Sequence, residues 1–213
     1  MELIDLSHPF FAGMPVYPGS ESPVIESVAT VRHEGYAEKR ITLFSHTGTH
    51  LDAPSHVLPR GLSLDRMAVD HFAGSASTLD FSSHPGRPIE IDDLMPYRYL
   101  IQNSDFILIH TGWSRHWGRE AYFTGYPVLS GPAANWLCGY GLKGLGVDTI
   151  SVDPPQAPGL PVHCRLMEQQ MIIVENLNRL QDLPQSGFQF FALPLRIQDG
   201  DGFPVRAVAM ISG

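Results

Sequence analysis

The stretch HTGTHLDAPSH, residues 46–56, constrains the fold of this chain more than any other segment. It contains three histidines and one aspartate, namely His46, His50, Asp52 and His56. Neutral imidazoles and carboxylates are common ligands of divalent metals, and the same groups perform general acid–base chemistry. The stretch therefore predicts a functional site of one of these two kinds.

The spacing of these four side chains indicates a bent backbone. Fully extended, the segment would span about 33 Å, whereas ligands of one ion lie a few Å apart because metal–ligand bonds are about 2.0–2.2 Å long. In a regular helix, His46 and His50 would share a face while the other two groups pointed elsewhere. Gly48 and Pro54 are residues that permit and fix bends. We expect a strand end that runs into a curled loop, with Thr47 and Thr49 in ordinary turn roles.

A second segment of interest is LPVHCRLMEQQMIIVENLNRL, residues 160–180. Glu175 follows the apolar run Met171–Val174, and a carboxylate that ends a buried strand is costly unless it is paired or bound to a metal. His163 precedes a predicted short helix that would return the chain toward Glu175. By itself, Glu175 could equally cap a strand or pair with an arginine. Together with the first stretch, this segment offers a further carboxylate and a further imidazole.

The remaining pattern is rich in strands. Runs with high strand propensity recur at Ser27–Arg32, Arg40–Phe44, Asp105–His110, Gly144–Val147, Met171–Glu175, Phe188–Pro194 and Val205–Ile211. Helical patterns are fewer and cover Ser63–His71, Gly131–Tyr140 and Leu166–Gln170. Because strands outnumber the interleaved helices, we predict a β-rich α/β fold. No linker or repeat interrupts the chain, so we expect a single domain over residues 1–213.

Charge and composition exclude several classes of function. The net charge of −8 disfavours nucleic acid or an anionic membrane surface as a partner. Two cysteines provide no disulfide framework. Neither a signal peptide nor an apolar run of about 20 residues is visible. We expect a cytoplasmic enzyme or binding protein with no membrane or nucleic-acid partner.

The segment HTGTHLDAPSH resembles the H-x-G-T-H-x-D-x-P-x-H signature of the metal-dependent cyclase-like hydrolases, the family of bacterial kynurenine formamidase (arylformamidase) and isatin hydrolase. LIDLSHPFFAGMPVYPG is similar to the opening of that family, and LIHTGWSRHW to its central tryptophan segment. GVDTISVD is similar to its following strand, and HCRLMEQQMIIVENLNRL to its second metal segment. The resemblance extends over nearly the whole chain.

The resemblance implies a metal site with two positions. His46, His50 and Asp52 would hold one divalent ion. Asp52 and Glu175 would also face a second position, which His163 would complete. Zinc and manganese both suit such ligands, and the sequence leaves the choice between them open.

His56 would be the acid–base group of the reaction that the resemblance implies. Metal-bound hydroxide would attack an amide carbonyl, and His56, with an unperturbed pKa near 6.5, would accept the water proton and pass it to the leaving nitrogen. The N-formyl group of an arylamine such as N-formylkynurenine is the simplest small-molecule substrate of this kind. The resemblance gives Cys164 no role, and we expect a buried thiol there.

The resemblance also implies an architecture and an assembly. The family has a compact swivelling β/β/α fold, in agreement with the β-rich α/β pattern. Its members form dimers or larger assemblies with the active site near a subunit interface, so a homodimer or homotetramer is expected.

One position bears on the choice of substrate. In the formamidases, the segment that corresponds to MPVYPG, residues 14–19, carries a tryptophan that packs on the aromatic substrate, and here Tyr17 takes its place. Tyrosine can also stack, but its smaller ring and hydroxyl change the pocket. Tyr17 is equally compatible with a plain turn between prolines.

Two alternatives to a formamidase remain open. One is a hydrolase of a cyclic amide or lactone, as in isatin hydrolase. The other is a metal-binding protein of the same fold without catalytic activity. The presence of all six candidate groups favours an enzyme, because metal binding alone would not require His56.

Overall fold

The computed structural model describes residues 1–84, 86–155 and 157–211. The strands are β1 Glu2–Asp5, β2 Val24–Ala29, β3 Glu38–Thr42, β4 His50–Asp52, β5 Ala73–Asp80, β6 Phe106–His110, β7 Gly144–Val147, β8 Ile172–Glu175, β9 Phe188–Phe191, β10 Gly202–Pro204 and β11 Val208–Ile211. The α-helices are α1 Val31–Glu34, α2 Ile91–Leu94, α3 Arg98–Gln102, α4 Gly131–Leu137 and α5 Pro161–Met167. Short 3-10 helices cover Pro54–His56, Val69–Phe72, Met95–Tyr97, Trp113–His116, Glu120–Phe123, Cys138–Tyr140 and Leu180–Asp182.

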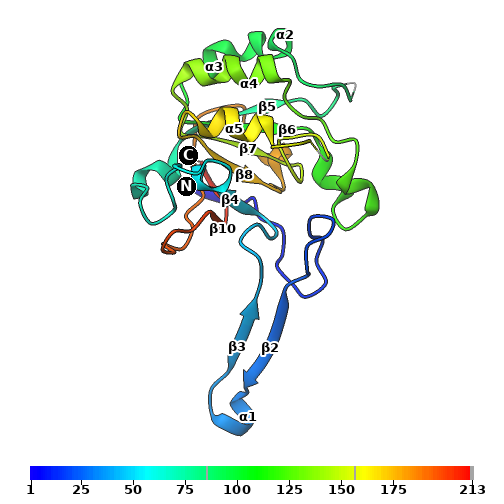
Figure 1. Ribbon diagram of the computed structural model, residues 1–213, viewed down its shortest axis with the longest axis vertical. Helices are drawn as coiled ribbons and strands as arrows, with labels where there is room; N and C mark the ends of the chain where they lie inside the picture. The colour runs from blue at the N-terminus through cyan, green and yellow to red at the C-terminus, as the bar shows by residue number, and fades with distance from the viewer. Residues whose placement is uncertain (85, 156, 212–213) are drawn as a thin grey trace.

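Nine strands form one mixed sheet in the order β1-β11-β9-β5-β6-β7-β8-β4-β10. The central strands β5, β6, β7 and β8 are parallel, and the strands on both sides of them pair antiparallel. Helices α2 to α5 lie together on one side of the sheet (Figure 1). The expected β-rich α/β architecture is confirmed.

The central strands are apolar on both faces because both faces are covered. Along β6, Phe106 and Leu108 enter one core cluster while Ile107 and Ile109 enter the other. The second cluster packs against the helices and includes Ala134 of α4. The first cluster lies inside the curl of the sheet, with residues from both of its ends. Every residue of β8 and β4 is buried by this packing, which restricts the side chains at their ends.

Several expected elements were placed wrongly. Residues Ser63–His71 form one hydrogen-bonded turn, in which the Met67 N–H donates to the Ser63 carbonyl, followed by the 3-10 helix Val69–Phe72, and Leu64 and Met67 are buried there without a continuous helix. The helix expected at Leu166–Gln170 is α5, which begins at Pro161 and therefore contains His163.

Strand boundaries also differ from the expectation. The run Ser27–Arg32 divides between β2 and α1, since Ala29 ends the strand and Val31 begins the helix. Strands β1, β5 and β10 were not anticipated, and β4 corresponds to the strand end expected within residues 46–56. β5 has the sequence AGSASTLD, whose small polar residues carry little strand propensity. The expected helix Gly131–Tyr140 is confirmed as α4 followed by the 3-10 turn Cys138–Tyr140.

Strands β2 and β3 pair only with each other in the described structure. With α1 at the tip, they form an arm that projects away from the main sheet (Figure 1). Among the described helices, none has the length and apolar character needed to cross a membrane.

Candidate metal centre

Strand β4 brings distant parts of the chain to one place. It pairs antiparallel with β8, which sets His50 opposite Glu175. On its other edge it pairs with β10, which sets Asp52 opposite Gly202. Helix α5 contributes His163 from its first turn. Residues separated by more than a hundred positions thus converge at the ends of neighbouring elements.

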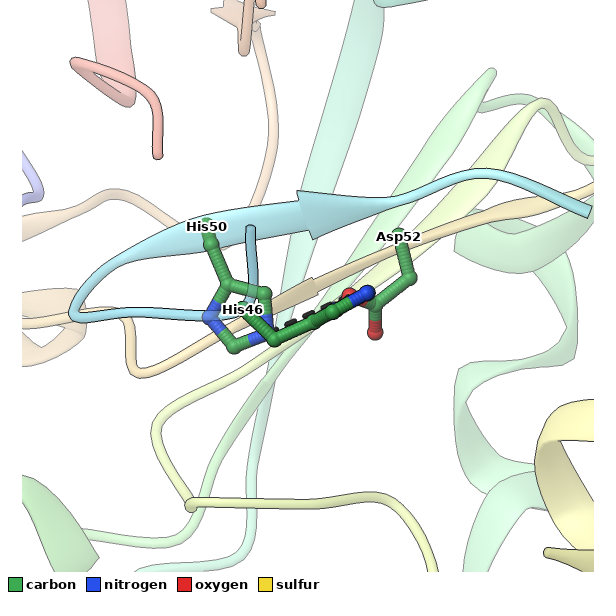
Figure 2. Close-up of side chains that lie close together, drawn as sticks. All are labelled: His46, His50 and Asp52. Carbon is green, nitrogen blue, oxygen red and sulfur yellow. Dashed lines mark hydrogen bonds and ion pairs between the residues drawn. The ribbon is translucent and has the colours of Figure 1, made fainter. Parts of the chain in front are cut away.

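The bend expected at residues 46–56 is present. Gly48 has a φ of +68°, in the left-handed region that favours glycine, and the chain turns there before β4 begins. The Thr47 hydroxyl donates to the Phe44 carbonyl at 2.8 Å, and the Thr49 hydroxyl donates to the Asn176 carbonyl at 2.6 Å. Thr47 therefore has the turn role expected of it, whereas Thr49 joins distant segments, since its hydroxyl also accepts from the His8 N–H at 2.9 Å. Figure 2 shows that the bend directs His46 back toward the side chains of β4.

The first group comprises His46, His50 and Asp52 (Figure 2). The Asp52 Oδ1 atom lies 2.6 Å from His46 Nδ1 and 3.2 Å from His50 Nε2. His50 and Asp52 are buried, and His46 is partly accessible. Three ligand atoms therefore face a common point.

The second group comprises Asp52, His163 and Glu175. His163 Nε2 lies 3.5 Å from Asp52 Oδ2 and 3.2 Å from Glu175 Oε1. All three residues are buried. Asp52 thus presents one carboxylate oxygen to each group, as a ligand shared by two ions would.

The chemistry of both groups fits a divalent metal. Ligands at about 2.1 Å from a tetrahedral ion lie about 3.4 Å apart, close to most of the distances in both groups. Imidazole nitrogens and carboxylate oxygens suit zinc and manganese. Both groups face a cavity, and among the described residues that line it, none is a lysine or an arginine. The buried carboxylates therefore have only imidazoles or a bound cation to balance their charge.

The pKa values reflect this balance. Burial lowers the pKa of His46, but the carboxylates of Asp52 and Asp201 outweigh burial and raise it to about 9. Burial likewise opposes charge on His163, yet hydrogen bonds to Asp153, Asp52 and Glu175 raise its pKa well above the ordinary value. A bound cation would have to displace these protons.

His56 lies beside the first group, at the end of the 3-10 helix Pro54–His56. Its ring centroid is 3.9 Å from that of His46 and 5.9 Å from that of His163. The expectation of an unperturbed pKa was wrong, because burial lowers the pKa of His56 to about 4. The ring is therefore neutral near pH 7, which is the form that accepts a proton.

Two carboxylates of the site were not singled out in the sequence. Asp153 Oδ2 lies 2.6 Å from His163 Nδ1, and Asp201 Oδ2 lies 3.0 Å from His46 Nε2. Asp201 belongs to the segment QDGDGFP, which has the composition of a turn, and only the pairing of β10 with β4 places it here. Asp153 stands before two prolines and carries no ligand-like spacing.

A cavity of about 400 Å³ opens onto both groups. Tyr17, Phe44, Ile150 and Leu160 line it together with the site residues. Tyr17 therefore lies at the cavity, although its side chain is 43% exposed. Cys164 is half-buried and donates to the Gly159 carbonyl at 3.3 Å, so the expectation of a buried thiol there was wrong.

Comparison with known proteins identifies the family. The family described as "Putative cyclase" matches residues 4–154. The chain belongs to this cyclase family. It is 30% identical to kynurenine formamidase of Erythrobacter litoralis over 209 residues, which are 96% of this chain and 91% of that protein. It is 31% identical to kynurenine formamidase of Bacillus cereus over 209 residues, 97% of this chain and 96% of that one.

A solved structure shows the same fold. Isatin hydrolase A from Labrenzia aggregata, bound to benzyl benzoate, superimposes with a TM-score of 0.89 at 25% identity. The match covers 100% of this chain and 94% of the other. The resemblance to the cyclase-like hydrolases and the expected swivelling β/β/α fold are confirmed.

Proposed function

We propose that this chain is a metal-dependent hydrolase that cleaves a carbon–nitrogen amide bond. The position of Asp52 carries the proposal, because each of its oxygens faces a separate set of buried ligands. A divalent ion in such a site lowers the pKa of water and polarises a carbonyl oxygen. The relatives support the proposal further, because the similarity to kynurenine formamidases and to an isatin hydrolase covers nearly the whole chain.

Charge balance supports two ions. Four carboxylates contact the imidazoles of the site: Asp52, Glu175, Asp153 and Asp201. Two divalent cations would compensate four negative charges, and no lysine or arginine lines the described cavity. Zinc and manganese remain the two candidate metals.

His56 is the proposed acid–base group. Its Nδ1 lies on the side of Asp201, at 3.9 Å from Oδ2, which leaves Nε2 as the proposed proton-accepting atom. A neutral imidazole at this place can take a proton from water and deliver it to the leaving nitrogen. The half-buried position beside His46 opposes lasting charge on the ring, which favours return of the proton.

The proposed substrate is an N-formyl arylamine such as N-formylkynurenine. Apolar side chains of Phe44, Ile150 and Leu160 would accept an aromatic ring, and the cavity has the size of a small-molecule site. A cyclic amide is the second candidate, because the isatin hydrolase A structure superimposes so closely.

A panel of formanilides, cyclic amides and lactones tests this proposal. The purified protein should hydrolyse at least one amide class, and chelation should abolish the reaction. Metal binding without turnover of any amide would instead support a non-catalytic metal-binding protein.

We expect Tyr17→Ala to raise the KM for aromatic substrates about 2- to 10-fold, because aromatic stacking contributes about 0.5–1.5 kcal/mol. Tyr17 is not one of the candidate ligands, so kcat should change little. Steady-state kinetics with one aryl substrate measure both constants. Tyr99→Ala, on the exposed surface of α3, is the matched control. An unchanged KM would assign Tyr17 to the turn alone.

We also propose that the arm packs against a second copy of the chain. An isolated two-stranded hairpin is marginally stable in water. This arm exposes Val24, Val28, Tyr36 and Ile41 at 45–57%, and such apolar surface gains stability when covered. The arm continues directly into Phe44 of the cavity, so the assembly would border the proposed active site.

Light scattering after size-exclusion chromatography tests the assembly. The mass should be twice the chain mass of 23.5 kDa, or a higher even multiple. Ile41→Asp should shift the protein toward the single-chain mass, whereas Tyr99→Asp should not. A wild-type protein that elutes as a single chain at micromolar concentration would contradict the proposal.

A further inference from the structure

Each of the three histidines in the two groups has its second ring nitrogen held by another acceptor. His46 Nε2 lies 3.0 Å from Asp201 Oδ2, and His163 Nδ1 lies 2.6 Å from Asp153 Oδ2. His50 Nδ1 lies 2.8 Å from the Gly48 carbonyl. Such outer partners fix the tautomer and the orientation of a metal-binding imidazole.

The ring nitrogens held in this way differ between the groups. In His46, Nε2 contacts Asp201 and Nδ1 faces Asp52 at 2.6 Å. In His163 the outer partner takes Nδ1, so Nε2 faces the second group. Once each ring has lost its extra proton to a bound cation, the remaining proton would lie on Nε2 of His46 and on Nδ1 of His163, which are opposite tautomers.

Asp153 is built rigidly into the core. It is fully buried, and its oxygens accept hydrogen bonds from the backbone N–H groups of Val162 and His163 at 2.8 and 3.0 Å. These are the first free N–H groups of α5, so one carboxylate both caps the helix and holds the imidazole.

Asp201 is held in place by its backbone rather than by its side chain. Its carbonyl accepts from the Ala53 N–H at 2.9 Å, which ties it to the end of β4. The following residue is Gly202, where a Cβ atom would lie 2.6 Å from His46 Cε1. The His46 ring can lie against this strand only because the side chain is missing, and Asp201 then meets its outer nitrogen. The Asp201 side chain is 47% exposed.

We infer that Asp201 and Asp153 are positioning residues that divide the site, with Asp201 serving the first group through His46 and Asp153 serving the second group through His163. The inference rests on the proposed metal centre. It assigns His46 to bind through Nδ1, and His50 and His163 to bind through Nε2. Neither carboxylate touches the reacting atoms.

The test compares Asp201→Asn and Asp153→Asn in the whole chain, with zinc as the probe. Loss of an outer partner typically weakens metal binding about 10–100-fold. Competition with a chelator should show that loss for one ion in Asp201→Asn. Anomalous scattering from crystals of Asp201→Asn grown at limiting zinc should show that the depleted position is the one between His46 and His50. Asp153→Asn should instead deplete the position at His163 and Glu175. Asp199→Asn, in the same turn as Asp201 and exposed, is the matched control.

Nitrogen spectra of the histidine rings give a second readout on the unaltered protein, which protects the test if Asp153→Asn fails to fold. Zinc-loaded protein should retain a proton on Nε2 of His46 and on Nδ1 of His163. The same tautomer for both rings, or equal loss of both ions in Asp201→Asn, would overturn the inference. A chain that binds no zinc at all would instead overturn the proposed metal centre.

Discussion

Asp52→Asn is expected to empty both metal positions and to lower amide hydrolysis by at least about 10³-fold. Asp52 is 1% exposed, and its two oxygens face the first and second groups separately. The substitution keeps the shape of the side chain but removes the charge shared by both positions. Loss of a single transition-state donor already costs about 10²–10³-fold, and here both proposed ions would be lost.

Metal analysis after dialysis and steady-state assays measure the effect of Asp52→Asn. Asp92→Asn, on the exposed surface of α2, is the matched control and should keep both metal and activity. Burial opposes charge on Asp52, but the neighbouring imidazoles outweigh burial and hold the pKa of this carboxyl well below the usual range. Asp52→Asn therefore also removes a buried charge pair. Circular dichroism should therefore confirm that it is folded. A folded variant with full metal content would contradict the shared-ligand role.

His56→Ala is expected to keep both ions and lose about 10²–10⁴ in kcat, the usual size of general acid–base catalysis. His56 also forms a cluster with His46 and Asp201, but its contact to Asp201 Oδ2, at 3.9 Å, is longer than the 2.6 Å contact between His46 and Asp52 in the first group. Metal content and kcat measured on the same preparation separate the two roles.

His71→Ala is the control for His56, because His71 lies in the 3-10 helix Val69–Phe72 away from the cavity. It should change neither quantity. Loss of an ion in His56→Ala would instead identify His56 as a metal ligand. A kcat close to that of the wild-type protein would show that His56 is not the acid–base group.

The local parts of the site could be predicted from the sequence. HTGTHLDAPSH indicates a bend because its four polar groups cannot converge otherwise, and Gly48 does adopt a positive φ there. MIIVE indicates a buried strand that ends in a carboxylate, and Glu175 is 5% exposed at the end of β8. In both cases the signal lies within a few residues.

The parts that depend on distant pairing could not be predicted. Asp201 reaches His46 only because β10 pairs with β4, about 150 residues earlier in the chain. The turn-like sequence around Asp201 does not indicate that pairing. The segment Ser63–His71 has apolar spacing that resembles a helix, but burial of Leu64 and Met67 in the first core cluster satisfies the same pattern without one. Tertiary packing overrides local propensity at these positions.

This chain is proposed to hold two divalent ions around Asp52. Calorimetric titration of metal-stripped protein with zinc or manganese at pH 7, in two buffers of different ionisation enthalpy, tests it most directly. We expect two ions per chain and a net release of protons, because the raised pKa of His46, about 9, means that its ring is protonated at pH 7 and must lose that proton on binding. Binding of fewer than two ions, or binding without proton release, would contradict the account.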